Sequence, residues 1–176
     1  SGFYVVVGNA AREILVSQTR GFILCFALVM IVITLGVRSI RLGLIAMLPN
    51  ILPLALLGGI LALAHETIDT DILGVAIISF GLAVDDTIHF LHRYDIQRRG
   101  STCIREALEQ TYNYTGNAII RTTVILGIGL LPFALSSYLS IRLLGTYLVF
   151  VLACAVLADL LLLPALVLLF DKEDIP

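Results

Sequence analysis

The chain has 176 residues, of which 59% are hydrophobic and 14% are charged, and its mean hydropathy is +1.03. Soluble domains carry about 25% charged residues, so this composition excludes an ordinary soluble domain and indicates a polytopic membrane protein. The net charge of −2 comes without any cluster of basic residues interleaved with aromatic ones. Nucleic acid is therefore not expected as a partner.

Five apolar segments are predicted to cross the bilayer, because a spanning helix needs about 20 mainly apolar residues. They are residues 21–37, 42–64, 72–91, 118–139 and 143–170. Pro49 and Pro53 in the second segment and Pro132 in the fourth are tolerated in membrane helices, which they bend or break. The predicted fold class is therefore all-α, a polytopic transmembrane helix bundle.

The lysines and arginines orient this bundle. Five spans alternate between the two sides, which places eight basic residues on one side and three on the other. The positive-inside rule assigns the richer side to the cytoplasm. Residues 1–20 are then expected outside, as the end of an extracytoplasmic domain or linker, and residues 171–176 form a cytoplasmic tail. The cytoplasmic set is Arg38, Arg41, Arg93, Arg98, Arg99, Arg105, Arg121 and Lys172, and the outer set is Arg12, Arg20 and Arg142.

The longest cytoplasmic connection contains a further helix signal. Gly100, Ser101 and Thr102 supply a break and a candidate N-cap, and apolar or small residues then recur at helical spacing on one face. This pattern predicts an amphipathic helix over residues 101–116. It fits a helix lying on the inner membrane surface and, equally, a connector packed beneath the bundle.

The third span carries two adjacent carboxylates, Asp85 and Asp86, in a segment without charge from residue 72 to residue 84. An ionised side chain inside a membrane helix costs several kcal/mol, roughly, so such residues usually face protein and serve a function. At ~100° per residue, Gly81, Asp85 and His89 share one stripe of the helix, whereas Asp86 points elsewhere. Because the stripe includes glycines, we expect it to pack closely against another helix.

A buried carboxyl beside a second carboxyl can exchange a proton near neutral pH, which is what proton coupling requires. Asp85 and Asp86 are therefore the predicted proton-coupling site, with Asp85 expected to be the more sensitive. The alternative is that both are satisfied by hydrogen bonds and only lock helix packing. His89, one turn further along, is a candidate relay or an interfacial anchor.

Three further polar residues are predicted at the same depth: Thr122 and Thr123 on the fourth span and Asp159 on the fifth. We expect them within side-chain reach of Asp85 as relays or partners. Asp159 could instead tether Arg121 at the inner boundary. A metal site built on Asp85, Asp86, His89 and His92 is disfavoured, because no second histidine cluster accompanies them. No metal or cofactor is expected.

These motifs resemble the resistance-nodulation-division (RND) superfamily, and most closely its MMPL branch of lipid and hydrophobe exporters, which includes Patched-like proteins. Residues 81–91, Gly-Leu-Ala-Val-Asp-Asp-Thr-Ile-His-Phe-Leu, are similar to the fourth-helix motif of that family. Residues 48–53, Leu-Pro-Asn-Ile-Leu-Pro, resemble the start of its third helix, and residues 158–165, Ala-Asp-Leu-Leu-Leu-Leu-Pro-Ala, resemble its sixth.

The resemblance implies that the five spans are helices two to six of one half of a two-half transporter. Its expected partners are the other half with the extracytoplasmic domains, membrane lipids, protons and a hydrophobic or lipid substrate. Proton uptake and release by fourth-helix aspartates carries over to Asp85 and Asp86. The expected location is a bacterial inner membrane, and the expected function is proton-driven export rather than enzymatic catalysis.

Two other functions remain open from the sequence. In a sterol-sensing-type domain, the same bundle would hold a lipid and regulate rather than pump. In an intramembrane aspartyl protease, carboxylates on two separate helices would converge, and residues 163–166, Leu-Pro-Ala-Leu, superficially fit. The protease is disfavoured because the segment before Asp85 lacks the Gly-x-Gly-Asp spacing and because no Tyr-Asp pair lies in an upstream apolar helix.

Overall fold

The computed structural model describes residues 2–37, 40–63, 70–101 and 103–170, and every element in them is helical. The predicted cytoplasmic tail, most of the acidic outer loop and the candidate cap Thr102 lie outside the described residues. Five of the described helices are long and apolar enough to cross a membrane. The all-α, polytopic bundle predicted from the sequence is therefore confirmed.

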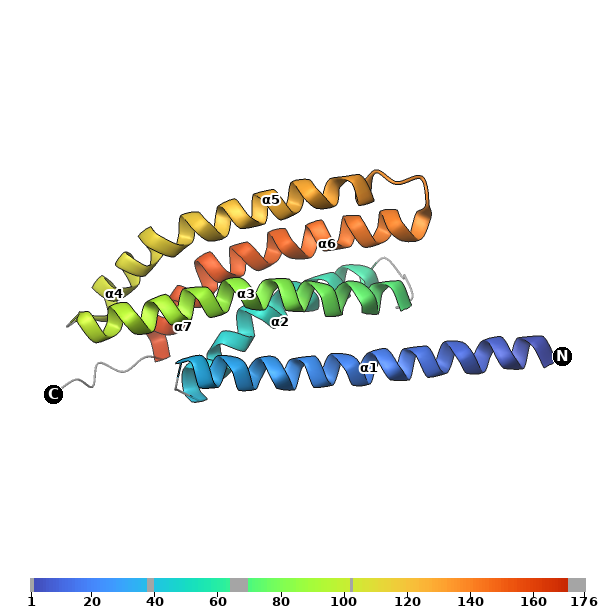
Figure 1. Ribbon diagram of the computed structural model, residues 1–176, viewed down its shortest axis with the longest axis horizontal. Coiled ribbons are helices and arrows are strands. Elements are labelled where there is room, and N and C mark those ends of the chain that lie inside the picture. The colour runs from blue at the N-terminus through green and yellow to red at the C-terminus, as the bar shows by residue number, and fades with distance from the viewer. Residues whose placement is uncertain (1, 38–39, 64–69, 102, 171–176) are drawn as a thin grey trace.

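The helices run in the order α1 (Gly2–Val37), α2 (Ile40–Leu63), α3 (Thr70–Gly100), α4 (Ile104–Thr111), η1 (Tyr112–Gly116), α5 (Asn117–Ala134), α6 (Leu139–Leu157), η2 (Ala158–Leu162) and α7 (Leu163–Phe170). The two η elements are single π-helical turns. Helices α2, α3 and α6 form the centre of the bundle, with α1 against α2 and α3 on one edge and α5 against α6 on the other (Figure 1).

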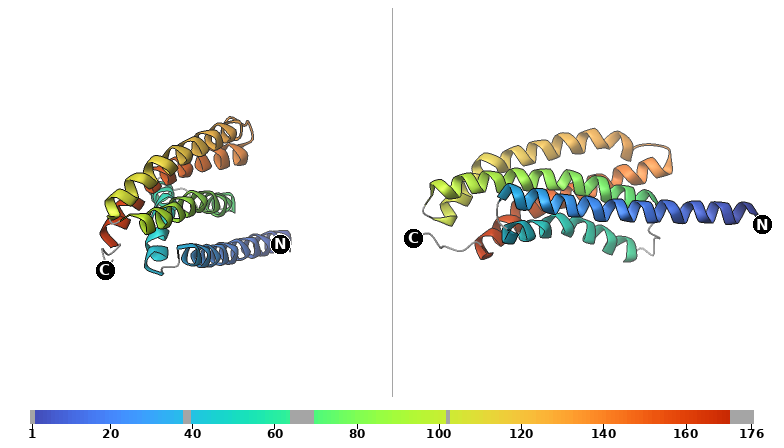
Figure 2. Two further views of the ribbon diagram at one scale, coloured as in Figure 1. Left: turned by 60° about the vertical axis from the view of Figure 1, so that its left-hand side comes forward. Right: turned by 60° about the horizontal axis from the view of Figure 1, so that its bottom comes forward.

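Helix α1 is much longer than the first predicted span. It is helical from Gly2, so residues 2–20 and the first predicted span form one continuous helix. At 1.5 Å per residue its 36 residues measure about 54 Å, well beyond a hydrocarbon core of about 30 Å. Its N-terminal end projects past the other helices (Figure 2).

The predicted separate helix over residues 101–116 is instead the beginning of one continuous helical run from Ile104 to Ala134. Ile104, Ala107, Leu108 and Thr111 are buried, as the amphipathic pattern predicted, but they pack against the protein core. This packing favours the connector alternative, because α3 and α7 cover the apolar face of α4.

Close packing between α5 and α6 depends on Gly145. A Cβ atom placed there would collide with the backbone of Phe133 and Ala134. Glycine permits this approach because it has no side chain, a common device where membrane helices touch. The rest of the core is mainly aliphatic and aromatic, with Phe80 stacked on Phe26 at 5.6 Å between ring centroids, and it includes a few buried polar side chains.

Candidate functional site

Three consecutive polar residues of α3 lie in three different environments. The Asp85 side chain is 74% exposed, Asp86 is half-buried, and Thr87 is fully buried. Successive side chains of a helix point ~100° apart, and α1, α2 and α6 cover only part of the circumference of α3. Helical geometry thus places Asp85 at an exposed position, Asp86 at an intermediate one and Thr87 at a buried one.

The stripe that carries Asp85 is uncovered in the described part of the chain. Gly81 and Ile78 on the same stripe are exposed, and a Cβ atom on Gly81 would meet nothing within 4 Å. The expectation that Asp85 packs against the fourth and fifth spans is therefore wrong for this chain. The physical reason is that α5 packs mainly against α6, so that it forms an open groove with this face of α3 and not a closed contact.

Asp85 is associated with His89, one turn along α3. Asp85 Oδ1 lies 3.6 Å from His89 Nε2, and the His89 side chain is 70% exposed. This separation is too long for a hydrogen bond but suits an ion pair when the imidazole is protonated. The predicted proximity of the two groups is present in the structure.

Asp86 lies in a groove of about 660 Å³ between α3 and the η1–α5 segment. Thr122 lines this groove and lies within hydrogen-bonding reach of the Asp86 carboxyl group. The Thr123 hydroxyl donates to the Ile119 carbonyl at 2.8 Å and does not line the groove. The lining residues are Asp85, Asp86, His89, His92, Arg93, Ile96, Tyr114, Thr115, Ala118, Ile119 and Thr122.

A cation–π contact lies in the same groove. The Arg93 guanidinium carbon is 4.6 Å from the centre of the Tyr114 ring, so an α3 side chain is stacked on the π-helical turn η1. Such contacts contribute about 0.5–1 kcal/mol at exposed sites. One side of the groove is therefore tied to α3 by a side-chain contact.

A buried hydrogen-bond network lies on the opposite side of α3. The Thr87 hydroxyl donates to Asp159 Oδ1 at 2.7 Å, and Asn50 Nδ2 donates to Thr87 Oγ1 at 3.1 Å and to the Ala46 carbonyl at 2.8 Å. Asn50, Thr87 and Asp159 are each at most 1% exposed. The network joins α2, α3 and η2, and π-helical turns such as η2 often mark functional positions.

The network determines where Asp159 lies. Its carboxylate accepts a hydrogen bond from Thr87, and it is close enough to Asp86 for the two to interact electrostatically. The alternative partner, Arg121, is exposed on α5. Asp159 is therefore near Asp86, as the depth comparison predicted, but it is separated from the exposed Asp85 stripe by the body of α3.

The sequence interpretation missed the roles of Asn50 and Thr87. Asn50 lies between Pro49 and Pro53 in an otherwise apolar segment, and Thr87 follows the two aspartates directly. A buried amide or hydroxyl needs a partner, so an Asn at this depth was a signal for a second polar residue on a facing helix. The sequence could not identify which helix supplies it.

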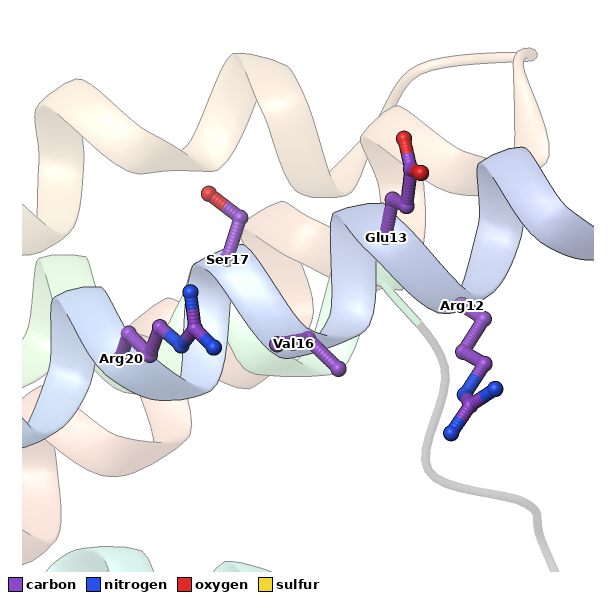
Figure 3. Close-up of a pocket in the computed structure, with 5 residues that line it drawn as sticks. All are labelled: Arg12, Glu13, Val16, Ser17 and Arg20. Atoms are coloured by element: carbon purple, nitrogen blue, oxygen red, sulfur yellow. The ribbon is translucent and has the colours of Figure 1, made fainter.

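A second hollow lies on the N-terminal half of α1 (Figure 3). All five of its lining residues belong to this one helix: Arg12, Glu13, Val16, Ser17 and Arg20. Glu13 and Ser17 point to one side of the helix and Arg12 to the other. Because no second element among the described residues contributes to the lining, this hollow is an open helix surface and does not form an enclosed site.

Comparison with known proteins identifies the family. The sequence profile of the MMPL family matches residues 10–174, which is nearly the whole chain. This chain belongs to the MMPL family. It is also similar to a Methanocaldococcus jannaschii protein, MJ1562, whose name describes it as a membrane protein, with 27% identity over 148 residues. The match covers 84% of this chain and 38% of that relative, so the chain spans well under half of the relative's length.

Membership of this family fits the RND-type resemblance of the motifs around Asp85, Pro49 and Asp159. The chain is thus a membrane domain of a transporter-like family, built of several apolar helices. Within the described residues, no three His, Cys, Asp or Glu side chains gather in a way that could hold a metal ion.

Proposed function

We propose that this MMPL-family chain is the membrane part of a proton-driven transporter that moves hydrophobic or amphiphilic molecules such as lipids, and that it is not an enzyme. The observation that carries the proposal is the position of Asp86. Its carboxyl group lies within a spanning helix, half-buried, at a groove with Asp85, His89 and Thr122. A carboxyl in this position can take up and release a proton within the membrane-spanning part of the protein.

The uncovered Asp85 stripe supports a second membrane partner. A carboxylate that faced lipid would cost several kcal/mol, roughly, so a side chain that is 74% exposed in this chain requires cover in the membrane. We propose that the other half of the transporter covers it, with extracytoplasmic domains that bind the substrate. The basic residues place the α4 end of the bundle in the cytoplasm, and we propose the inner (plasma) membrane of a bacterium as the location.

The decisive experiment measures transport by the full-length protein in proteoliposomes under an imposed pH gradient. Asp86→Asn and Asp85→Asn are expected to abolish substrate movement and proton flux, because an amide keeps the volume but cannot cycle a proton. His89→Gln is expected to slow transport less, since water can replace a relay.

Asp95→Asn is the matched control. Asp95 lies on the same helix but is paired with Arg99 at 2.8 Å near the end of α3, outside the groove, so its amide variant should retain transport. Undiminished gradient-dependent transport by the Asp85→Asn, Asp86→Asn double variant would overturn the proposal. Retained lipid binding by that variant without any gradient dependence would favour a sterol-sensing-type domain.

A further inference from the structure

The Thr87 hydroxyl has more acceptors around it than it can serve. Asp159 Oδ1 lies at 2.7 Å, Asn50 Oδ1 at 3.2 Å and the Ala83 carbonyl at 3.4 Å. A hydroxyl has one proton to donate and two lone pairs with which to accept. At any moment Thr87 can therefore donate fully to only one of three groups, which belong to η2, α2 and α3.

The protonation state of Asp159 decides which group receives that proton. An ionised carboxylate can only accept, so in that state Thr87 donates to Asp159 and accepts from Asn50 Nδ2, across separations of 2.7 Å and 3.1 Å. A protonated carboxyl can donate, so Thr87 would then accept from Asp159 and turn its own proton toward Asn50 Oδ1 or the Ala83 carbonyl. Each state leaves the buried hydroxyl satisfied, and when the proton turns to Asn50 Oδ1 the hydrogen bond between α3 and α2 reverses its direction.

The groups that face Asp159 connect this reversal to the groove. Asp86, the neighbour of Thr87 in the chain, interacts electrostatically with Asp159. Helix α7 has no ionisable side chain, and α2 has only Arg41, nine residues before Asn50. On α6, Tyr147 and the half-buried Cys154 precede Asp159, and Arg142 is exposed near the far end of the helix. Among these groups, Asp86 is the carboxyl placed to change its charge during transport.

We propose that Asn50, Thr87 and Asp159 form a positioning network that transmits the proton state of the α3 carboxyl groups to the packing of α2, α3 and η2. The inference rests on the proposed proton coupling. In this network, Asp86 exchanges the transported proton, and its change of charge alters the protonation state of Asp159. The Thr87 hydroxyl then reorients to suit that protonation state. The helices that meet at the network then exchange one hydrogen-bond arrangement for another, both fully buried.

The test compares Thr87→Val with Thr87→Ser in the full-length protein. Valine keeps the branched shape and removes the hydroxyl, whereas serine keeps the hydroxyl. Infrared difference spectroscopy across a pH titration follows the carboxyl band that disappears in Asp159→Asn. We expect the pH midpoint of that band, and of proton-driven flux, to shift by about one unit in Thr87→Val and to stay unchanged in Thr87→Ser.

The infrared titration needs no transport, so it separates this inference from the proposed function. An unshifted midpoint in Thr87→Val, with only a loss of stability, would overturn the network and leave Asp86 as the proton site. A shifted midpoint together with normal transport by Asp86→Asn would support the network and overturn the proposed function. If Thr87→Val is not recovered folded, Asn50→Leu removes the α2 arm, and an unshifted midpoint in that variant would likewise overturn the inference.

Discussion

The two sides of α3 differ sharply although they are built from neighbouring residues. On one side, Asp85 and His89 form a widely exposed pair separated by 3.6 Å, at the open groove between α3 and the η1–α5 segment. On the other side, Thr87 is fully buried and bonded to Asn50 and Asp159. The first side leaves its carboxylate exposed in this chain, whereas the second side satisfies its polar groups within the chain.

This difference shows how one motif can serve two purposes in a membrane. Polar groups that are satisfied internally stabilise the bundle and respond to each other, while an uncovered carboxylate requires protein cover from elsewhere. Asp86 lies between the two sides, at the groove, and has electrostatic contact with both Asp85 and Asp159. The comparison therefore makes Asp86, rather than Asp85, the carboxyl that links the open side to the closed one.

The largest expected effect contrasts the close α5–α6 contact at Gly145 with the open stripe of α3 at Gly81. Gly145→Ala should lower the free energy of unfolding by about 3 kcal/mol, because its Cβ atom would meet the Ala134 backbone and cannot be accommodated without moving a helix. Gly81→Ala, on the open stripe, should have little effect in this chain. Unfolding of the purified proteins in mixed detergent micelles measures both, and equal losses would show that the open stripe is packed.

A smaller effect is expected from the polar groups themselves. Asn50→Ala should cost about 2 kcal/mol, because it leaves Thr87 without its donor and creates a small cavity between α2 and α3. Asp85→Ala should change stability by less than about 0.5 kcal/mol, as is usual for an exposed side chain. The same unfolding measurement applies, and a larger loss for Asp85→Ala than for Asn50→Ala would reverse the comparison.

The smallest expected effect concerns the groove between the two sides. Tyr114→Leu should cost about 0.5 kcal/mol by removing the ring beneath Arg93. Tyr138→Leu is a matched control, since both tyrosines are 66% exposed and Tyr138 has no cation above its ring among the described contacts. Thermal unfolding of the two variants in parallel measures the difference, and identical midpoints would mean that the stack does not hold η1 against α3.

The sequence predicted the spanning helices better than it predicted where they begin and end. Hydropathy identified the spans well because it depends on local composition, but it placed the start of the first helix at residue 21 and the end of the fourth at residue 139. The structure extends α1 back to Gly2 and ends α5 at Ala134. Polar residues near a span can continue a helix without being apolar, so hydropathy does not define the helix ends.

The candidate site, too, was predicted from the sequence only in those features that depend on a single segment. The sequence alone determined the fold class, the carboxylates at mid-helix depth and the stripe shared by Asp85 and His89, because helical periodicity and the cost of charge in a bilayer act within one segment. Only the tertiary structure decided that Asp85 is exposed, that Thr122 and not Thr123 lines the groove, and that Thr87 bonds to both Asn50 and Asp159. Those facts depend on which helix faces which, and that is set by close packing between segments far apart in the chain.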